Sequence, residues 1–284
     1  MSKLEVRKFP WNFSGVDFVW NPDHPSFAIT MNKFSFWAIG FEKYICDVMR
    51  DAEKLIKDPA VLAEAQVFRT QESVHSLAHR KHVRALIERY PGLQESLDKV
   101  IKHYDDLYAS RDLKYHLAYI GALESTFTPS MKLLIDNRED LMAKGDARVA
   151  SLLLWHFCEE IEHRASGIAI YDELFGNYFF KVKNFKGFLK HVMSVFELMD
   201  AEFRIHVNDV PQKLYTPDRN RPLPRLQRAK MIYGVLMSQM PWHKAEHQTE
   251  AKYFQEWLTH YKRGDDMTQI YGVAIKQTAQ AIAN

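Results

Sequence analysis

One stretch of the chain, SLLLWHFCEEIEHRASG at positions 151–167, constrains the fold more than any other. Its apolar residues have the spacing of a buried helix. Within eight residues it also carries five ionisable side chains, namely His156, Glu159, Glu160, Glu162 and His163. A charged group inside a protein is strongly destabilising unless it is paired or binds a metal ion. The stretch therefore predicts a core helix that has partners for its charges.

Helical periodicity recurs along the rest of the chain, without the alternating pattern of strands. The predicted helices cover 32–57, 59–90, 95–108, 112–143, 147–175, 184–207, 229–240 and 242–262. Asp58 followed by Pro59 is a typical helix start, and Gly145 with Asp146 is typical of a tight turn between two helices. The sequence therefore predicts an all-α protein.

The connections predict how these helices are arranged. The first two long helices are joined by very few residues, as are the next two, so each pair should form an antiparallel hairpin. About twenty residues with a short helix of their own lie between the hairpins, enough to run the length of a bundle. This is a ferritin-like four-helix bundle with one long crossover. We expect a single domain over 1–284, with an irregular arm (1–31), the bundle (32–176) and additional C-terminal helices with a proline-rich loop (177–284).

Two of the long helices carry a Glu-x-x-His motif, at Glu72–His75 and at Glu160–His163. Residues three apart lie side by side on one helix face, so the His can hold one metal while the Glu bridges to a second. Each of the other two long helices holds a Glu among apolar neighbours, Glu42 and Glu124. A single such motif is weak evidence, but this order over four helices matches the ferritin-like dimetal pattern.

His156 adds a third imidazole, one turn before Glu160 on the same face. The predicted metal ligands are therefore Glu42, Glu72, His75, Glu124, His156, Glu160 and His163. Carboxylate and imidazole donors suit iron, manganese or zinc. Four carboxylates balance two divalent ions, so we expect two iron ions (Fe2+/Fe3+), with manganese or zinc as alternatives.

Other ionisable residues lie close to this face. Glu159 is the candidate catalytic residue, and three roles stay open for it: a ligand in place of its neighbour, a base behind the ligands, or the partner of an arginine. His79 is expected behind the ligands or in the core. Glu162 points to the opposite side of its helix and is expected at the surface, and His82 at a solvated helix end.

The segment HFCEEIEH, read as HxxxExxH, resembles the fourth-helix motif of the diiron arylamine N-oxygenases such as p-aminobenzoate N-oxygenase. That resemblance implies an additional ligand at His156, a bridging carboxylate at Glu160 and a terminal imidazole at His163. Over about residues 30–260 the chain resembles the bacterial "predicted metal-dependent hydrolases" of the ferritin-like superfamily. The word hydrolase in that description implies little about the chemistry.

Composition excludes several classes of function. The net charge is only +2, with acids and bases interspersed, so we expect no nucleic-acid partner. No apolar run is long enough for a transmembrane segment, and the N-terminus has no signal-peptide pattern. Two cysteines do not make a disulfide framework, so a cytoplasmic location is expected.

The sequence favours an enzyme in which a non-heme diiron centre activates O2. The expected partners are a small apolar or aromatic substrate, O2 and an electron donor, and the substrate is hydroxylated, N-oxygenated or desaturated. The alternatives are a hydrolase with a metal-activated water and, in another class, an iron-storage or metal-sensing protein. Whether the protein forms a homodimer stays open.

Two further features concern the surroundings of the centre. Pro129 should kink its helix. Arg221, Arg225 and Arg228 belong to a solvated loop or to a lid that binds a substrate carboxylate.

Overall fold

The computed structural model describes residues 4–142, 144–216 and 223–271, and every regular element in these ranges is helical. The α-helices are α1 (Pro25–Ala52), α2 (Pro59–Arg89), α3 (Leu93–Ser110), α4 (Leu113–Asp136), α5 (Arg138–Met142), α6 (Ala147–Glu162), α7 (Ser166–Leu174), α8 (Tyr178–His206), α9 (Arg225–Met237) and α10 (Lys252–Arg263). Short 3-10 turns lie at Gln212–Tyr215 and Ala245–His247. The predicted all-α helical bundle is confirmed.

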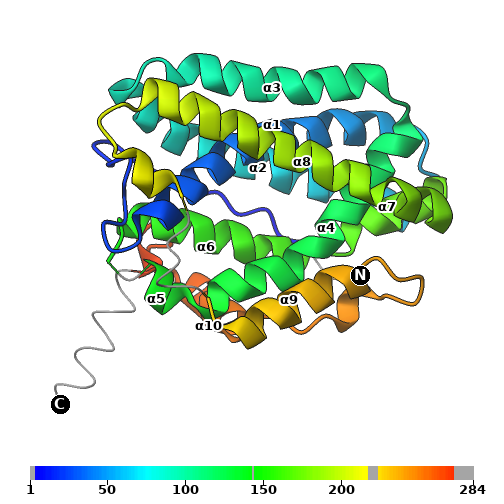
Figure 1. The fold of residues 1–284 in the computed structure, drawn as a ribbon. Helices are drawn as coiled ribbons and strands as arrows, with labels where there is room; N and C mark the ends of the chain where they lie inside the picture. Colours follow the sequence, from blue (N-terminus) through cyan, green and yellow to red (C-terminus); the bar gives the residue numbers. More distant parts are fainter. Residues whose placement is uncertain (1–3, 143, 217–222, 272–284) are drawn as a thin grey trace.

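Two helical hairpins form the bundle (Figure 1). α1 packs along α2, and α4 packs along α6 and α7. Contacts of α2 with α6 and α7, and of α1 with α4, hold the two hairpins together. α3 connects the hairpins and lies on α1, next to α8, while α9 and α10 cover the other side of the bundle against α4. No helix among the described residues is long and apolar enough to cross a membrane.

The predicted helix starts depend on side-chain caps. The Asp58 carboxylate accepts hydrogen bonds from the backbone N–H groups of Ala60 and Val61, and Asp146 accepts one from Arg148. Each cap satisfies backbone donors that the first turn of a helix leaves without partners. These caps fix where α2 and α6 begin, and both helices carry a Glu-x-x-His motif.

The irregular arm is shorter than predicted. α1 begins at Pro25, not near residue 32, because a proline is favoured in the first turn of a helix, where its missing N–H breaks no hydrogen bond. The described part of the arm is packed into the core through Trp11, Phe13 and Phe18, none of which is more than 5% exposed. The arm is therefore part of the wall around the bundle interior.

The predicted fourth helix is divided into α6 and α7. The break follows His163, whose carbonyl accepts a hydrogen bond from the N–H of Ser166. It places the backbone of Gly167 against Gly121 of α4, where a Cβ on Gly121 would lie 3.0 Å from the Gly167 carbonyl oxygen. Gly121 therefore leaves room for the backbone of the neighbouring helix.

The C-terminal helices also differ from the prediction. α8 begins at Tyr178, six residues earlier than predicted, and α9 covers Arg225–Met237. Residues 242–251, predicted as helix, are irregular apart from one 3-10 turn. Of the three predicted lid arginines, Arg221 lies outside the described residues.

Candidate metal centre

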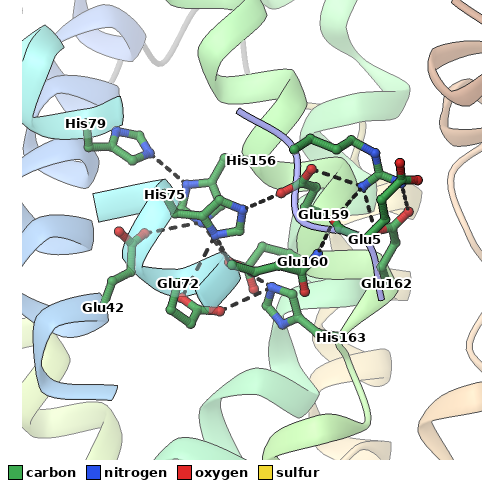
Figure 2. A network of polar contacts seen from close by, with 12 residues as sticks. Glu5, Glu42, Glu72, His75, His79, His156, Glu159, Glu160, Glu162 and His163 are labelled. Atoms are coloured by element: carbon green, nitrogen blue, oxygen red, sulfur yellow. Dashed lines mark hydrogen bonds and ion pairs between the residues drawn. The ribbon is translucent and has the colours of Figure 1, made fainter. Parts of the chain in front are cut away.

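Four helices bring the seven predicted ligands together in the bundle interior, and Figure 2 labels all of them except Glu124. Glu42 comes from α1, the first Glu-x-x-His pair from α2 and Glu124 from α4, while His156 and the second pair come from α6 and its C-cap. None of the seven side chains belongs to a residue that is more than 2% exposed. The structure therefore buries four carboxyl groups and three imidazoles in one place.

The two Glu-x-x-His pairs form the first group of candidate donors. Glu72, His75, Glu160 and His163 each offer one ligand atom, and these atoms all lie within 4.8 Å of one another. His75 Nδ1 is 3.9 Å from a carboxylate oxygen of Glu72 and 3.9 Å from one of Glu160. His163 Nε2 is 3.2 Å from Glu72 Oε1. Two carboxylates and two imidazoles in this arrangement could hold one metal ion.

A second group lies beside the first and consists of Glu42, His79 and His156. His156 Nε2 is 3.4 Å from Glu42 Oε1 and 2.7 Å from Glu160 Oε1. Glu160 therefore lies between the two groups, which is the position that a bridging carboxylate needs. His79, expected behind the ligands, is close enough to count among the candidate donors itself.

The donor atoms of these groups have few hydrogen-bond partners. Within the described part of the chain, several buried atoms make no hydrogen bond, namely both oxygens of Glu42, Glu72 Oε1, His75 Nδ1, Glu124 Oε1, Glu160 Oε2 and His163 Nε2. A buried polar atom without a partner costs about 1–3 kcal/mol. That cost is removed if the atoms ligate a cation, so the residues fit the metal pair that the sequence predicts.

Glu124 lies next to the first group without belonging to it. Its Oε2 accepts a hydrogen bond of 3.0 Å from His163 Nδ1. This bond orients the imidazole and leaves His163 Nε2 facing Glu72, an arrangement common around metal-bound histidines. Glu124 belongs to neither group of candidate donors in the described residues, so its role as a metal ligand stays a prediction.

Glu159 orients His75 from the opposite side. Its Oε2 accepts a 2.9 Å hydrogen bond from His75 Nε2, which directs Nδ1 toward the donor group. Its Oε1 accepts a 3.0 Å hydrogen bond from Arg7 of the arm. Of the roles left open by the sequence, the structure shows the pairing with an arginine together with a position behind a candidate ligand.

The prediction that Glu162 lies at the surface is wrong. Arg7 donates hydrogen bonds of 2.8 Å to each oxygen of Glu162, whose side chain is only 11% exposed. Burial raises the pKa of Glu162, although the hydrogen bond and charge of Arg7 oppose this shift. The role of Arg7 could not be predicted, because an irregular arm has no periodicity that would assign its side chains to a face.

His82 is also buried, not solvated, and it ends a chain of hydrogen bonds that starts at His156. His156 Nδ1 lies 2.7 Å from His79 Nε2, His79 Nδ1 3.0 Å from Ser35 Oγ, and Ser35 Oγ 3.1 Å from His82 Nδ1. If His156 Nε2 is free of a proton, as a metal ligand must be, each group along this chain donates to the next. The chain then fixes the tautomer and the ring orientation of His156.

Burial determines the protonation of the centre. Desolvation raises the pKa of Glu42, Glu124 and Glu160 well above the ordinary value, and the neighbouring carboxylates raise it further. Burial lowers the pKa of His156 well below its ordinary value. Desolvation lowers the pKa of His75, but the hydrogen bond to Glu159 and the charges of Glu159 and Glu72 outweigh it, so the pKa is raised. The raised pKa values of Glu42, Glu124 and Glu160 favour their protonated forms when no cation is bound, and a divalent ion would displace those protons.

Aromatic rings enclose the centre. Phe34 lies 5.3 Å from the His156 ring, Trp155 4.9 Å from His75, and Phe68 5.0 Å from His163, measured between ring centroids. These rings exclude water and lower the local dielectric constant, which strengthens every electrostatic interaction among the donors.

Comparison with known proteins identifies one family. A family model described as "Predicted metal-dependent hydrolase" matches residues 5–211, a range that contains every candidate donor described above. No curated protein and no solved structure matches the chain.

Proposed function

The chain belongs to the predicted metal-dependent hydrolase family, and from this premise we propose that it is an enzyme with a two-metal centre. The residues that would hold the pair are Glu42, Glu72, His75, His156, Glu160 and His163, and Glu160 lies beside both donor groups. The observation that carries this proposal is the set of buried donor atoms without hydrogen-bond partners in the described residues.

We propose iron as the metal. The donors are carboxylates and imidazoles, a set that suits iron, manganese and zinc better than softer metals. Neither cysteine belongs to a donor group among the described residues, and burial raises the pKa of the Cys158 thiol well above its ordinary value. A thiolate ligand is therefore not part of the proposal.

The proposed reaction is O2-dependent oxidation of a small organic substrate. A bound iron pair would supply the electrons that activate O2, and an external donor would restore them. The protein supplies the surroundings: the aromatic wall formed by Phe34, Phe68 and Trp155 keeps bulk water from the donors. Exclusion of bulk water would protect reactive intermediates of an oxidation from side reactions.

Three residues are proposed to act through the ligands. Glu159 holds the His75 ring by accepting from Nε2, and both of its oxygens are already engaged, so we assign it a positioning role. Glu124 holds His163 in the same manner. His79 donates to Ser35 and accepts from His156, which keeps His156 Nε2 directed at Glu160.

Hydrolysis is the second candidate function, favoured by the description of the matched family. Metal pairs held by carboxylate and histidine can also activate a water molecule.

Mixing the anaerobically reduced protein with O2 tests the proposal. Iron in the purified protein and a transient charge-transfer band in the near-UV or visible range after mixing would support oxidation. Zinc without any reaction with O2 would favour hydrolysis instead. A Glu159→Gln variant should retain metal but bind it about 10- to 100-fold more weakly, as is typical when a residue that hydrogen-bonds to a metal ligand is replaced.

A further inference from the structure

A cavity of about 730 Å³ lies between α4, α9 and the segment 242–249. α4 and α9 lie side by side in Figure 1. The volume is in the range of small-molecule sites. Apolar side chains form much of its wall, among them Leu133, Met231, Met237 and Trp242.

The cavity is built around the proline in α4. Pro129 has no N–H, so the Ser125 carbonyl loses its helical partner, and Gln248 donates its side-chain N–H to that oxygen at 3.1 Å. On the opposite wall, Gly234 of α9 packs against Pro129, and a Cβ at Gly234 would lie 2.7 Å from Pro129 Cβ. Both walls are therefore fixed to the part of α4 that follows Glu124.

Among the lining residues, Thr128 lies nearest along α4 to Glu124 of the metal centre. It lines the cavity, is only 1% exposed, and its hydroxyl has no hydrogen-bond partner among the residues that the structure describes. Thr128 follows Glu124 by one helical turn, which is a rise of about 6 Å along the axis. The inner end of the cavity thus approaches the residue that holds His163.

The rim of the cavity is positively charged. Lys132 is paired with Asp136 at 2.7 Å. Lys230 and Lys244 also line the cavity, are exposed, and form no ion pair with any described residue. Of the predicted lid arginines, the two that the structure describes, Arg225 and Arg228, are not among the lining residues. Within the described ranges, the rim therefore carries two cationic side chains, Lys230 and Lys244, that have no ion-pair partner.

We propose that this cavity binds a small organic anion with an apolar body. Its anionic group lies at the rim with Lys230 and Lys244, its body lies on Met231 and Met237, and its other end points toward Thr128. That this anion is the substrate of the metal centre rests on the proposed function; that the cavity binds it does not. α9 lies outside the matched range 5–211, so the family match covers the centre but not this wall.

Calorimetric titration of the as-purified, full-length protein tests the proposal, with 4-phenylbutyrate as the probe and the uncharged 4-phenylbutanamide for comparison. The acid should bind about tenfold more tightly than the amide, because charge-assisted hydrogen bonds are the stronger ones. A Lys230→Gln/Lys244→Gln double variant should lose about tenfold in affinity for the acid and nothing for the amide. The matched control is Lys183→Gln/Lys186→Gln on α8, which removes two exposed lysines elsewhere and should bind as the parent does.

Equal affinities for the acid and the amide would overturn the proposal, as would undiminished binding by the Lys230→Gln/Lys244→Gln variant or no binding of either probe. Circular dichroism of each variant checks its folding, which two exposed substitutions should leave unchanged. Metal content is measured on the same samples, and the titration is repeated after chelation. If the as-purified protein contains no metal but binds the acid, the cavity assignment stands and the proposed function is rejected. If the as-purified protein contains metal but does not bind the acid, the cavity assignment alone is rejected.

Discussion

Replacing Arg7 with methionine tests how the arm supports the metal centre. Arg7 is paired with Glu159 and Glu162, and the exposed fractions of the three side chains are 3%, 1% and 11%. Methionine keeps an unbranched apolar chain but leaves two buried carboxylates without their cation. Removing one partner of a buried ion pair costs about 3–5 kcal/mol, so Arg7→Met should lower the free energy of unfolding by about that amount near neutral pH.

The matched control is Arg89→Met. Arg89 also pairs with an arm residue, Asp17, but their side chains are 48% and 72% exposed. Exposed pairs contribute about 0–1 kcal/mol, so this control should change stability only slightly. Urea unfolding of both variants, followed by fluorescence and circular dichroism, gives the comparison.

The cost of Arg7→Met should depend on pH. Burial raises the pKa of Glu162 in the folded protein even with Arg7 present, and loss of the guanidinium raises it further. A carboxyl group with a raised folded-state pKa favours folding below its unfolded pKa, and this contribution is lost as pH rises through the folded pKa. The deficit of the variant should therefore be larger at about pH 7.5 than at about pH 5. A deficit that equals the Arg89→Met control, or one that does not change with pH, would refute the reasoning.

Three further predictions concern the centre and its packing. Ser35→Ala breaks the hydrogen-bond chain behind His156 and should weaken metal binding about 10-fold or more in competition with a chelator, with unchanged affinity as the contrary result. Metal binding should release protons, detectable with a pH indicator, because burial raises the pKa of Glu42 and Glu160 and so favours their protonated forms when no cation is bound. The apparent affinity for the metal should therefore rise with pH, and an affinity that does not change with pH would contradict this. Gly121→Ala should destabilise the fold by about 1–3 kcal/mol, because the new Cβ would meet the backbone of the neighbouring helix. Gly187→Ala on α8, where the new Cβ would meet no atom within 4 Å, should stabilise the fold by about 0.5–1 kcal/mol. Equal melting temperatures for the two variants would contradict this prediction.

The helical pattern and the order of the candidate donors could be predicted from sequence. Periodicity assigns side chains to a helix face, and Asp caps with Pro and Gly mark helix ends, so the sequence alone places Glu72–His75 and Glu160–His163 on two helices of one bundle. The division between α6 and α7 could not be predicted, because it accompanies a close approach of Gly121 and Gly167, and periodicity along one helix does not show contacts with another helix.

The groups behind the donors were harder to predict. Arg7 lies in an irregular segment, where sequence gives no direction for a side chain. The spacing indicated that His82 is buried, since it follows His75 by seven residues and shares its helix face. Its neighbours Arg80 and Lys81, however, indicated a solvent-exposed helix end. Burial of one helix face next to exposed basic residues is decided by packing of the arm, including Phe13, whose ring lies 5.2 Å from the His82 ring.

The central claim is that buried carboxylates and imidazoles of four helices hold a pair of metal ions, and metal counting tests it most directly. The full-length protein, Glu160→Gln and the control Glu88→Gln, an exposed α2 glutamate, would be stripped, reloaded and analysed by elemental mass spectrometry. We expect about two metal ions per chain in the parent and the control, and loss of most of that metal in Glu160→Gln, because Glu160 lies beside both donor groups. No bound metal in the parent protein, or full occupancy in Glu160→Gln, would contradict it.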